Sequence, residues 1–193
     1  GFYAGSPASV SINDPYAAVP GYASTTQPAH MYGAPPPGLG TYLVAYSGFS
    51  AGGIEYLYIS PVDDPLGTPT FSWSFVSLGD IDSTATAMPD APQSGTAITI
   101  ETNDRRSLNA VWRDDALWVA TTIVAPAGAD SGQATAYWVK VNAPGLTVAD
   151  KGLVGGEDIA ASTYTFFPSV TVDQDGNMAI GFAASGASIF PGA

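Results

Sequence analysis

The chain has 193 residues, of which 46% are hydrophobic, and this is enough for one domain with a sizeable core. Five Lys and Arg residues face 17 Asp and Glu residues, which gives a formal net charge of −12. Nucleic acids and anionic membrane surfaces are bound through Lys and Arg, so we expect neither as a partner. The absence of Cys excludes a disulfide scaffold, a thiolate zinc site and a cysteine nucleophile.

No apolar run approaches ~18 residues, so the sequence predicts no membrane-spanning segment. The first residues, Gly1-Phe2-Tyr3-Ala4, lack the basic start and apolar centre of a signal peptide, and no initiator Met is present. We therefore expect a processed chain or a part of a larger polypeptide. Secretion remains compatible with the composition.

The first 80 residues predict four short strands separated by turns. Ala8–Ile12 is the first, and residues 13–40, rich in Pro, Gly and Tyr, follow as a long loop. We expect three tyrosines of this loop, Tyr16, Tyr22 and Tyr32, at the surface. The next strands are predicted over Thr41–Ser47, Ile54–Ser60 and Phe71–Leu78. In the last of these, every second residue is aromatic, which predicts one buried and one exposed face.

The second half of the chain predicts a similar series. A short strand over Ala97–Glu101 is followed by four longer ones, over Leu108–Arg113, Leu117–Val124, Ala134–Asn142 and Leu146–Asp150, the last with an extension to Val154. Ser169–Val172 and Met178–Phe182 then form a hairpin around the turn Asp175-Gly176-Asn177. No stretch shows a sustained 3.6-residue period, so the predicted fold class is all-β.

The strands fall into three groups, residues 1–80, 97–155 and 165–193, within one all-β domain. Four-stranded antiparallel meanders in series are typical of β-propeller blades. The segments PSVTVDQDGNMAIGFAASG and RSLNAVWRDDALWVATT resemble secreted bacterial propellers of the sialidase or BNR-repeat superfamily. SPVDDPLGTPTFSW, with Ser60, Asp63, Gly67 and Phe71, is similar to a degenerate Asp-box. The resemblance implies an extracellular or cell-surface protein.

A closed propeller needs at least about four blades, and this chain supplies roughly two and a half. Open strand edges are avoided in natural proteins. We therefore expect either a larger polypeptide or a homo-oligomer whose neighbouring chains complete the ring. A β-sandwich is the structural alternative.

The most charged stretch of the sequence, around Asp104, Arg105 and Arg106, is the first candidate ligand site. In a propeller, this loop and the loop with Glu157 and Asp158 lie on the face that usually binds ligands. Adjacent arginines can hold a carboxylate or sulfate through bidentate hydrogen bonds. The alternative is local ion pairing of Arg105 or Arg106 with Asp104 or Glu101.

A candidate metal site comprises Asp173, Asp175 and Asn177, whose oxygen-bearing side chains alternate as in a calcium loop. Calcium is accordingly the one cofactor that the sequence suggests. The alternative is a hairpin turn that needs no metal, because Asp, Asn and Gly all favour turn geometry. His30 is the only His and lies in the long loop, so no catalytic residue is assigned.

The resemblance to sialidases does not extend to their three-arginine site. Arg105, Arg106 and Arg113 are the only arginines, and all three belong to one predicted blade. We therefore expect a non-catalytic extracellular module for binding or assembly, with carbohydrate or neighbouring protein chains as partners. The alternatives are a sialidase-like glycoside hydrolase completed by other blades, and a structural subunit of a surface layer or filament.

Overall fold

The computed structural model describes residues 12–15, 17 and 25–193, and every regular element in them is a β-strand. The all-β prediction is therefore confirmed. The strands are β1 (Gln27–Pro28), β2 (His30–Tyr32), β3 (Leu39–Ala45), β4 (Ser50–Ala51), β5 (Ile54–Asp63), β6 (Thr70–Phe71), β7 (Ser74–Gly79), β8 (Ser107–Arg113), β9 (Ala116–Val124), β10 (Ala134–Asn142), β11 (Thr147–Val154), β12 (Tyr164–Val172), β13 (Met178–Gly186) and β14 (Ile189–Gly192).

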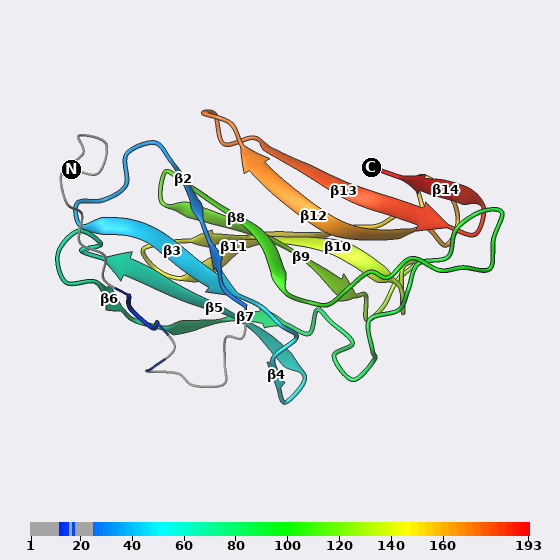
Figure 1. The fold of residues 1–193 in the computed structure, drawn as a ribbon, viewed down its shortest axis with the longest axis horizontal. Helices are drawn as coiled ribbons and strands as arrows, with labels where there is room; N and C mark the ends of the chain where they lie inside the picture. The colour runs from blue at the N-terminus through cyan, green and yellow to red at the C-terminus, as the bar shows by residue number, and fades with distance from the viewer. Residues whose placement is uncertain (1–11, 16, 18–24) are drawn as a thin grey trace.

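The strands form three sheets (Figure 1). In the first sheet β5 is central, with β3 and β4 on one side, β6 and β7 on the other, and β1 beyond β3. The second sheet has the order β11-β10-β9-β8-β2, and the third has the order β12-β13-β14. All pairs are antiparallel except β2 with β8, which is parallel.

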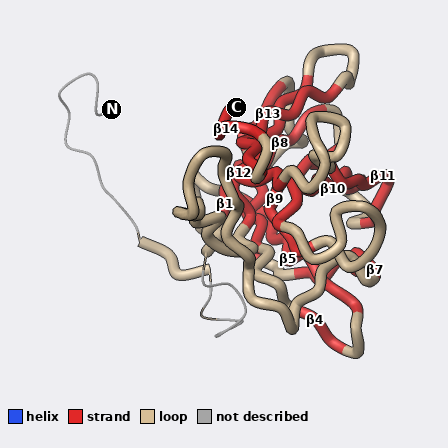
Figure 2. The backbone as a smooth tube through the Cα atoms, turned by 90° about the vertical axis from the view of Figure 1, so that its right-hand side faces the viewer, coloured by secondary structure: helices blue, strands red, loops and turns tan. Residues whose placement is uncertain are grey.

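The sheets are stacked, with the second sheet in the middle (Figure 2). Trp112 of β8 and Leu117 and Val119 of β9 pack against the first sheet. Val111 and Trp118 point the other way and pack against β12 of the third sheet. Because both faces of the middle sheet are covered, all residues of β9 are buried, and the strand is apolar or Thr throughout.

Most predicted strands are present, and β10 has the predicted bounds. The predicted strand Ala8–Ile12 lies, except for Ile12, outside the described residues. The predicted strand Ala97–Glu101 is reduced to a single bridge between Ala91 and Ile100. Three regions predicted to be irregular contain strands, namely β1 and β2 within residues 13–40, β4 between the predicted strands Thr41–Ser47 and Ile54–Ser60, and β14 after the last predicted strand.

The predicted strand Phe71–Leu78 is divided into β6 and β7. Val76 and Leu78 face the core, whereas the Phe75 side chain is 51% exposed on the outer face. Both the odd-numbered and the even-numbered positions of this segment contain apolar residues. Alternation alone could therefore not decide which face is buried.

Stacked antiparallel sheets are compatible with the β-sandwich alternative, and the propeller stays a prediction. No closed barrel is formed by the strands of the described residues. The part of the chain that the structure describes also has no helix long and apolar enough to cross a membrane.

Candidate functional site

Arg105, a predicted ligand-binding residue, is held in a network between the first two sheets. Its Nε donates to Oδ2 of Asp82 at 2.7 Å, and its Nη2 donates to the carbonyl oxygens of Ser83 and Thr86. The Asp82 side chain is fully buried in this ion pair. It also accepts hydrogen bonds from the Tyr46 hydroxyl at 2.8 Å and from the Val124 amide at 3.0 Å. The side-chain oxygens of Asp82 are thus used to join the sheets.

Glu55 is a second buried carboxylate at this end of the sheets, at 1% exposure. Its Oε2 accepts a hydrogen bond from the Ile81 amide at 2.7 Å. Burial raises the pKa of Glu55, and the charge on Asp82 raises it further, while backbone hydrogen bonds oppose the rise. Burial beside Asp82 raises the pKa of Tyr46 as well, so this phenol stays protonated.

Among the other predicted ligand residues, Asp104 and Arg106 pair with each other, and Glu157 accepts hydrogen bonds from its own loop and from Gln133 Nε2, the latter at 3.3 Å. Arg106 Nε donates to both Asp104 oxygens, at 2.7 and 2.9 Å, and hydrogen bonding to Arg106 lowers the pKa of Asp104. Glu157 Oε1 accepts from the Ser162 amide at 2.8 Å, and Asp158 is exposed. No hydrogen bond or ion pair of the described residues joins the Asp104 loop to the Glu157 loop. Anion binding by this set stays a prediction.

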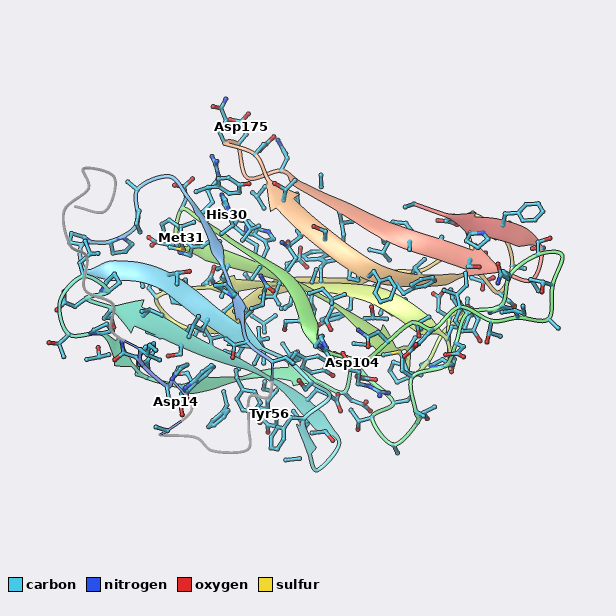
Figure 3. The ribbon with its side chains drawn as sticks, viewed as in Figure 1. Asp14, His30, Met31, Tyr56, Asp104 and Asp175 are labelled. Carbon is cyan, nitrogen blue, oxygen red and sulfur yellow. The ribbon has the colours of Figure 1, made fainter. Side chains whose placement is uncertain are left out.

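The predicted metal residues Asp173, Asp175 and Asn177 form the turn between β12 and β13. Asp173 Oδ1 accepts from the amides of Asp175 and Asn177 at 2.9 and 2.8 Å, and Oδ2 accepts from the Asn177 side chain at 2.9 Å. These hydrogen bonds lower the pKa of Asp173. No group of three or more His, Cys, Asp or Glu in the described residues could hold a metal ion, so calcium stays a prediction. Asp175 and Asp104 lie in separate parts of the molecule (Figure 3).

Of the three loop tyrosines, Tyr16 and Tyr22 lie outside the described residues. Tyr32 ends β2, with its ring 4.4 Å from that of His30 and with the Arg113 guanidinium 5.2 Å from its centroid. It is half-buried against the core between the second and third sheets. Tyr32 therefore has a packing role in this structure.

An aromatic surface covers part of the outer face of the first sheet. Phe75 meets Tyr58 edge-on at 4.7 Å between centroids, and Phe49 lies 5.4 Å from Tyr58. Phe49, Tyr56 and Phe75 line a shallow apolar hollow of about 210 Å³, and Tyr56 is labelled in Figure 3. The hollow offers rings for stacking, but few polar atoms to orient a ligand.

A cleft with both polar and apolar lining residues opens between the first two sheets, at the end of β8 opposite Asp104. Its volume is about 330 Å³, within the range of about 300–1,000 Å³ that is typical of small-molecule sites. Its polar side chains come from both sheets and their turns: Tyr42, Asp63, Ser72, Ser74 and Asp115. We refer to it as the Tyr42 cleft.

Asp115 reaches the cleft from the hairpin between β8 and β9. Arg113 pairs with Ala116, which leaves Asp114 and Asp115 as a two-residue turn. Both have positive φ, 47° and 61°, as the two central residues of a type I′ turn require, and Asp tolerates this region better than most residues. The Asp115 carbonyl accepts from the Ala143 amide at 2.7 Å, which ties the turn to the neighbouring hairpin.

Asp63 is the last residue of β5, and its partner across the sheet is Leu39 of β3. Directly paired residues of antiparallel strands share a face, and Leu39 packs against the core between the first two sheets. The same rule directs Ser74, which pairs with the buried Ile59, toward the cleft.

Tyr42 of β3 forms the floor of the cleft. It is 8% exposed and belongs to the core between the first two sheets. Burial raises its pKa first, and the charges of Asp115 and Asp63 raise it further. Among the described residues the Tyr42 hydroxyl has no hydrogen-bond partner. The floor of the cleft therefore presents a protonated phenol that can donate to, or accept from, a ligand.

The side walls of the cleft are mostly apolar. They are formed by Pro36, Pro37, Leu39, Pro61, Ala143, Pro144 and Leu146. Rigid apolar walls with a few converging acceptors suit a ligand that has both C–H faces and polar hydrogens. Sequence reasoning placed Asp63 in the degenerate Asp-box and did not assign Tyr42 or Asp115 to a site. The one feature of the sequence that could have pointed to this site is the pair Asp114-Asp115, because two adjacent Asp residues between two strands indicate a turn that carries carboxylates.

This chain matches no protein family, no curated protein and no solved structure. The resemblance to sialidase or BNR-repeat propellers thus stays a prediction. The functional argument depends on the geometry of the site.

Proposed function

We propose that this chain is a non-catalytic, extracellular carbohydrate-binding module that holds its ligand in the Tyr42 cleft. The observation that carries the proposal is the Tyr42 hydroxyl, which belongs to a side chain only 8% exposed and has no hydrogen-bond partner among the described residues, in a cleft that the carboxylates of Asp63 and Asp115 also line. Sugar hydroxyls can donate to carboxylates, and sugar C–H faces can lie against proline and leucine walls. Neutral polymers also suit a chain with a net charge of −12, which repels polyanions.

A panel of soluble oligosaccharides tests this function by calorimetry. Ser72→Trp should abolish binding, because Ser72 is an exposed residue of the cleft and the indole would fill the space. Ser169→Trp is the matched control, since Ser169 is an exposed strand residue of the third sheet. Absence of binding by the unmodified chain, or equal binding by Ser72→Trp, would overturn the proposal.

The same panel, prepared as aryl glycosides, separates binding from hydrolysis. Binding without release of the aryl alcohol supports the module. Turnover that is lost in Asp63→Asn or Asp115→Asn would replace the module with the glycoside hydrolase alternative.

Exposed apolar side chains of the third sheet favour a second candidate function, assembly with other copies of this chain. Phe190 is 75% and Ile159 is 53% exposed, and they border a hollow of about 460 Å³ that Ile180 and Phe182 also line. Large exposed apolar patches commonly mark protein interfaces. Light scattering should then show a concentration-dependent assembly that Phe190→Ser weakens; a monomer at every concentration would contradict this candidate.

A further inference from the structure

The acidic side chains of the Tyr42 cleft have no basic partner. The cleft residues include two carboxylates, Asp63 and Asp115, and no Lys, Arg or His. Neither carboxylate takes part in an ion pair within the described residues. The cleft is therefore a concentrated acceptor site in a protein that has very few cations of its own.

Each of the five basic side chains of the chain is engaged elsewhere, and all five lie in the described part. Arg105 pairs with Asp82, and Arg106 pairs with Asp104. Lys140 lies over the Trp118 ring at 4.9 Å, and Lys151 donates to the Leu78 carbonyl. The remaining one is Arg113, over Tyr32.

Arg113 adjoins the Asp114-Asp115 turn in sequence, yet it lies on the other face of the second sheet. Its neighbour Trp112 packs toward the first sheet, so Arg113 points toward the third. Its charge contributes there to the lowered pKa of Asp173. The cation nearest in sequence is thus directed away from the cleft, which leaves Asp63 and Asp115 for a cation from outside.

An ammonium group fits these acceptors better than a hydroxyl or a metal ion does. It has three N–H donors, one for each of the two carboxylates and one for the Tyr42 oxygen, whereas a hydroxyl has one. Calcium takes six to eight oxygen ligands, and the largely apolar walls of the cleft do not supply that number. The same walls suit the carbon skeleton that carries the ammonium.

We propose that the Tyr42 cleft selects saccharides with a free amino group, such as 2-amino-2-deoxyhexose units, over their neutral counterparts. The inference rests on the proposed carbohydrate-binding function. In the bound state the ammonium lies between Asp63 and Asp115, with the Tyr42 hydroxyl below it and the sugar ring against Leu39 or Leu146.

The test compares three β-1,4-linked tetrasaccharides that differ at one substituent: glucosamine, N-acetylglucosamine and glucose. Calorimetry is done at about pH 6, where a primary amine is protonated. We expect the glucosamine tetramer to bind at least about tenfold more tightly than the other two, since it alone brings an unshared positive charge to two carboxylates. Asp63→Asn combined with Asp115→Asn should remove the preference.

Asp150→Asn combined with Glu101→Gln is the matched control, because both are exposed acids outside the cleft and their joint loss changes the net charge as much as the double substitution does. It should keep the preference. A preference that survives the double substitution and disappears in 0.5 M salt reflects the overall charge and overturns the inference. Equal binding of all three sugars that Ser72→Trp abolishes overturns the inference but keeps the proposed function. Absence of binding by all three overturns both.

Discussion

Strand β3 connects two acidic sites that differ in how their oxygens are used. Directly after its last residue, Tyr46 donates to Asp82, which also accepts from Arg105 and from the Val124 amide. At its middle, Tyr42 lines the cleft with Asp63 and Asp115, which have no ion pair in the described residues. Two tyrosines four positions apart thus have opposite roles. The first site stabilises the packing of two sheets, and the second leaves its polar groups for a ligand.

The largest expected effect on stability comes from removing Asp82, whose carboxylate is fully hydrogen-bonded. Asp82→Ala should lower the free energy of unfolding by about 3–5 kcal/mol, because it leaves the largely buried Arg105 guanidinium and the Tyr46 hydroxyl without their acceptor. Urea denaturation followed by far-UV circular dichroism measures the loss. Asp104→Ala is the control, since its ion pair with Arg106 is exposed and should contribute little. Equal losses in both variants would show that the Asp82 network does not hold the sheets together.

The next prediction compares the two tyrosines directly. Tyr46→Phe should cost about 1.5–3 kcal/mol of stability, since it removes a buried hydrogen bond to a carboxylate. Tyr42→Phe should leave stability nearly unchanged, because the Tyr42 hydroxyl has no partner in the described residues, but it should weaken saccharide binding. Denaturation and calorimetry on the same two variants check both statements. A stability loss in Tyr42→Phe as large as that in Tyr46→Phe would contradict the difference between the sites.

Much of this fold follows from local sequence patterns, and the sites do not. β10 was predicted with its bounds because Ala134–Asn142 is a β-rich run between the turn residues Gly132 and Pro144. The strand β14 was missed, since its four residues include Pro and Gly and show no alternation. The burial of Val76 rather than Phe75 depends on the stacking of sheets, which no local pattern contains.

The site residues depend on stacking even more. Arg105 and Asp82 are 23 positions apart, and their contact exists only because the first two sheets pack together. Sequence reasoning assigned Arg105 to a ligand because its neighbours in sequence are charged. The Tyr42 cleft likewise takes residues from β3, β5 and β7, from the segments before β3 and between β6 and β7, and from two hairpin turns. Spacing along the chain could not select Asp63 and Asp115 from 17 acids.

The buried Glu55, which lies at the same end of the sheets as Asp82, should make stability depend on pH. Because burial raises the pKa of Glu55, the folded chain retains this proton over a pH range in which the unfolded chain has released it. The contribution of protonated Glu55 to the free energy of unfolding is fully present below the pKa of Glu55 in the unfolded chain. It is lost as the pH rises through the pKa of Glu55 in the folded chain. Glu55→Gln should therefore gain stability relative to the unmodified chain as the pH rises from about 4 to 7, over the range set by the ordinary Glu pKa. Thermal unfolding at several pH values measures this difference, and a constant difference would mean that Glu55 ionises alike in both states.

The smallest effect is expected at the turn that presents Asp115. Asp114 has a φ of 47° and lies next to the cleft without lining it, so Asp114→Gly relieves the positive φ and should change stability by less than about 1 kcal/mol. Saccharide binding should persist, because Asp115 and its tie to Ala143 are kept. Asp115→Gly changes the adjacent residue of the same turn and removes the carboxylate, so binding should fall while stability changes as little. Denaturation of the two variants measures the effect of the turn on stability, and calorimetry measures the effect of the Asp115 carboxylate on saccharide binding. If both variants bind equally well, the Asp115 carboxylate is not a ligand contact, and the cleft must recognise its ligand through Tyr42 and Asp63 alone.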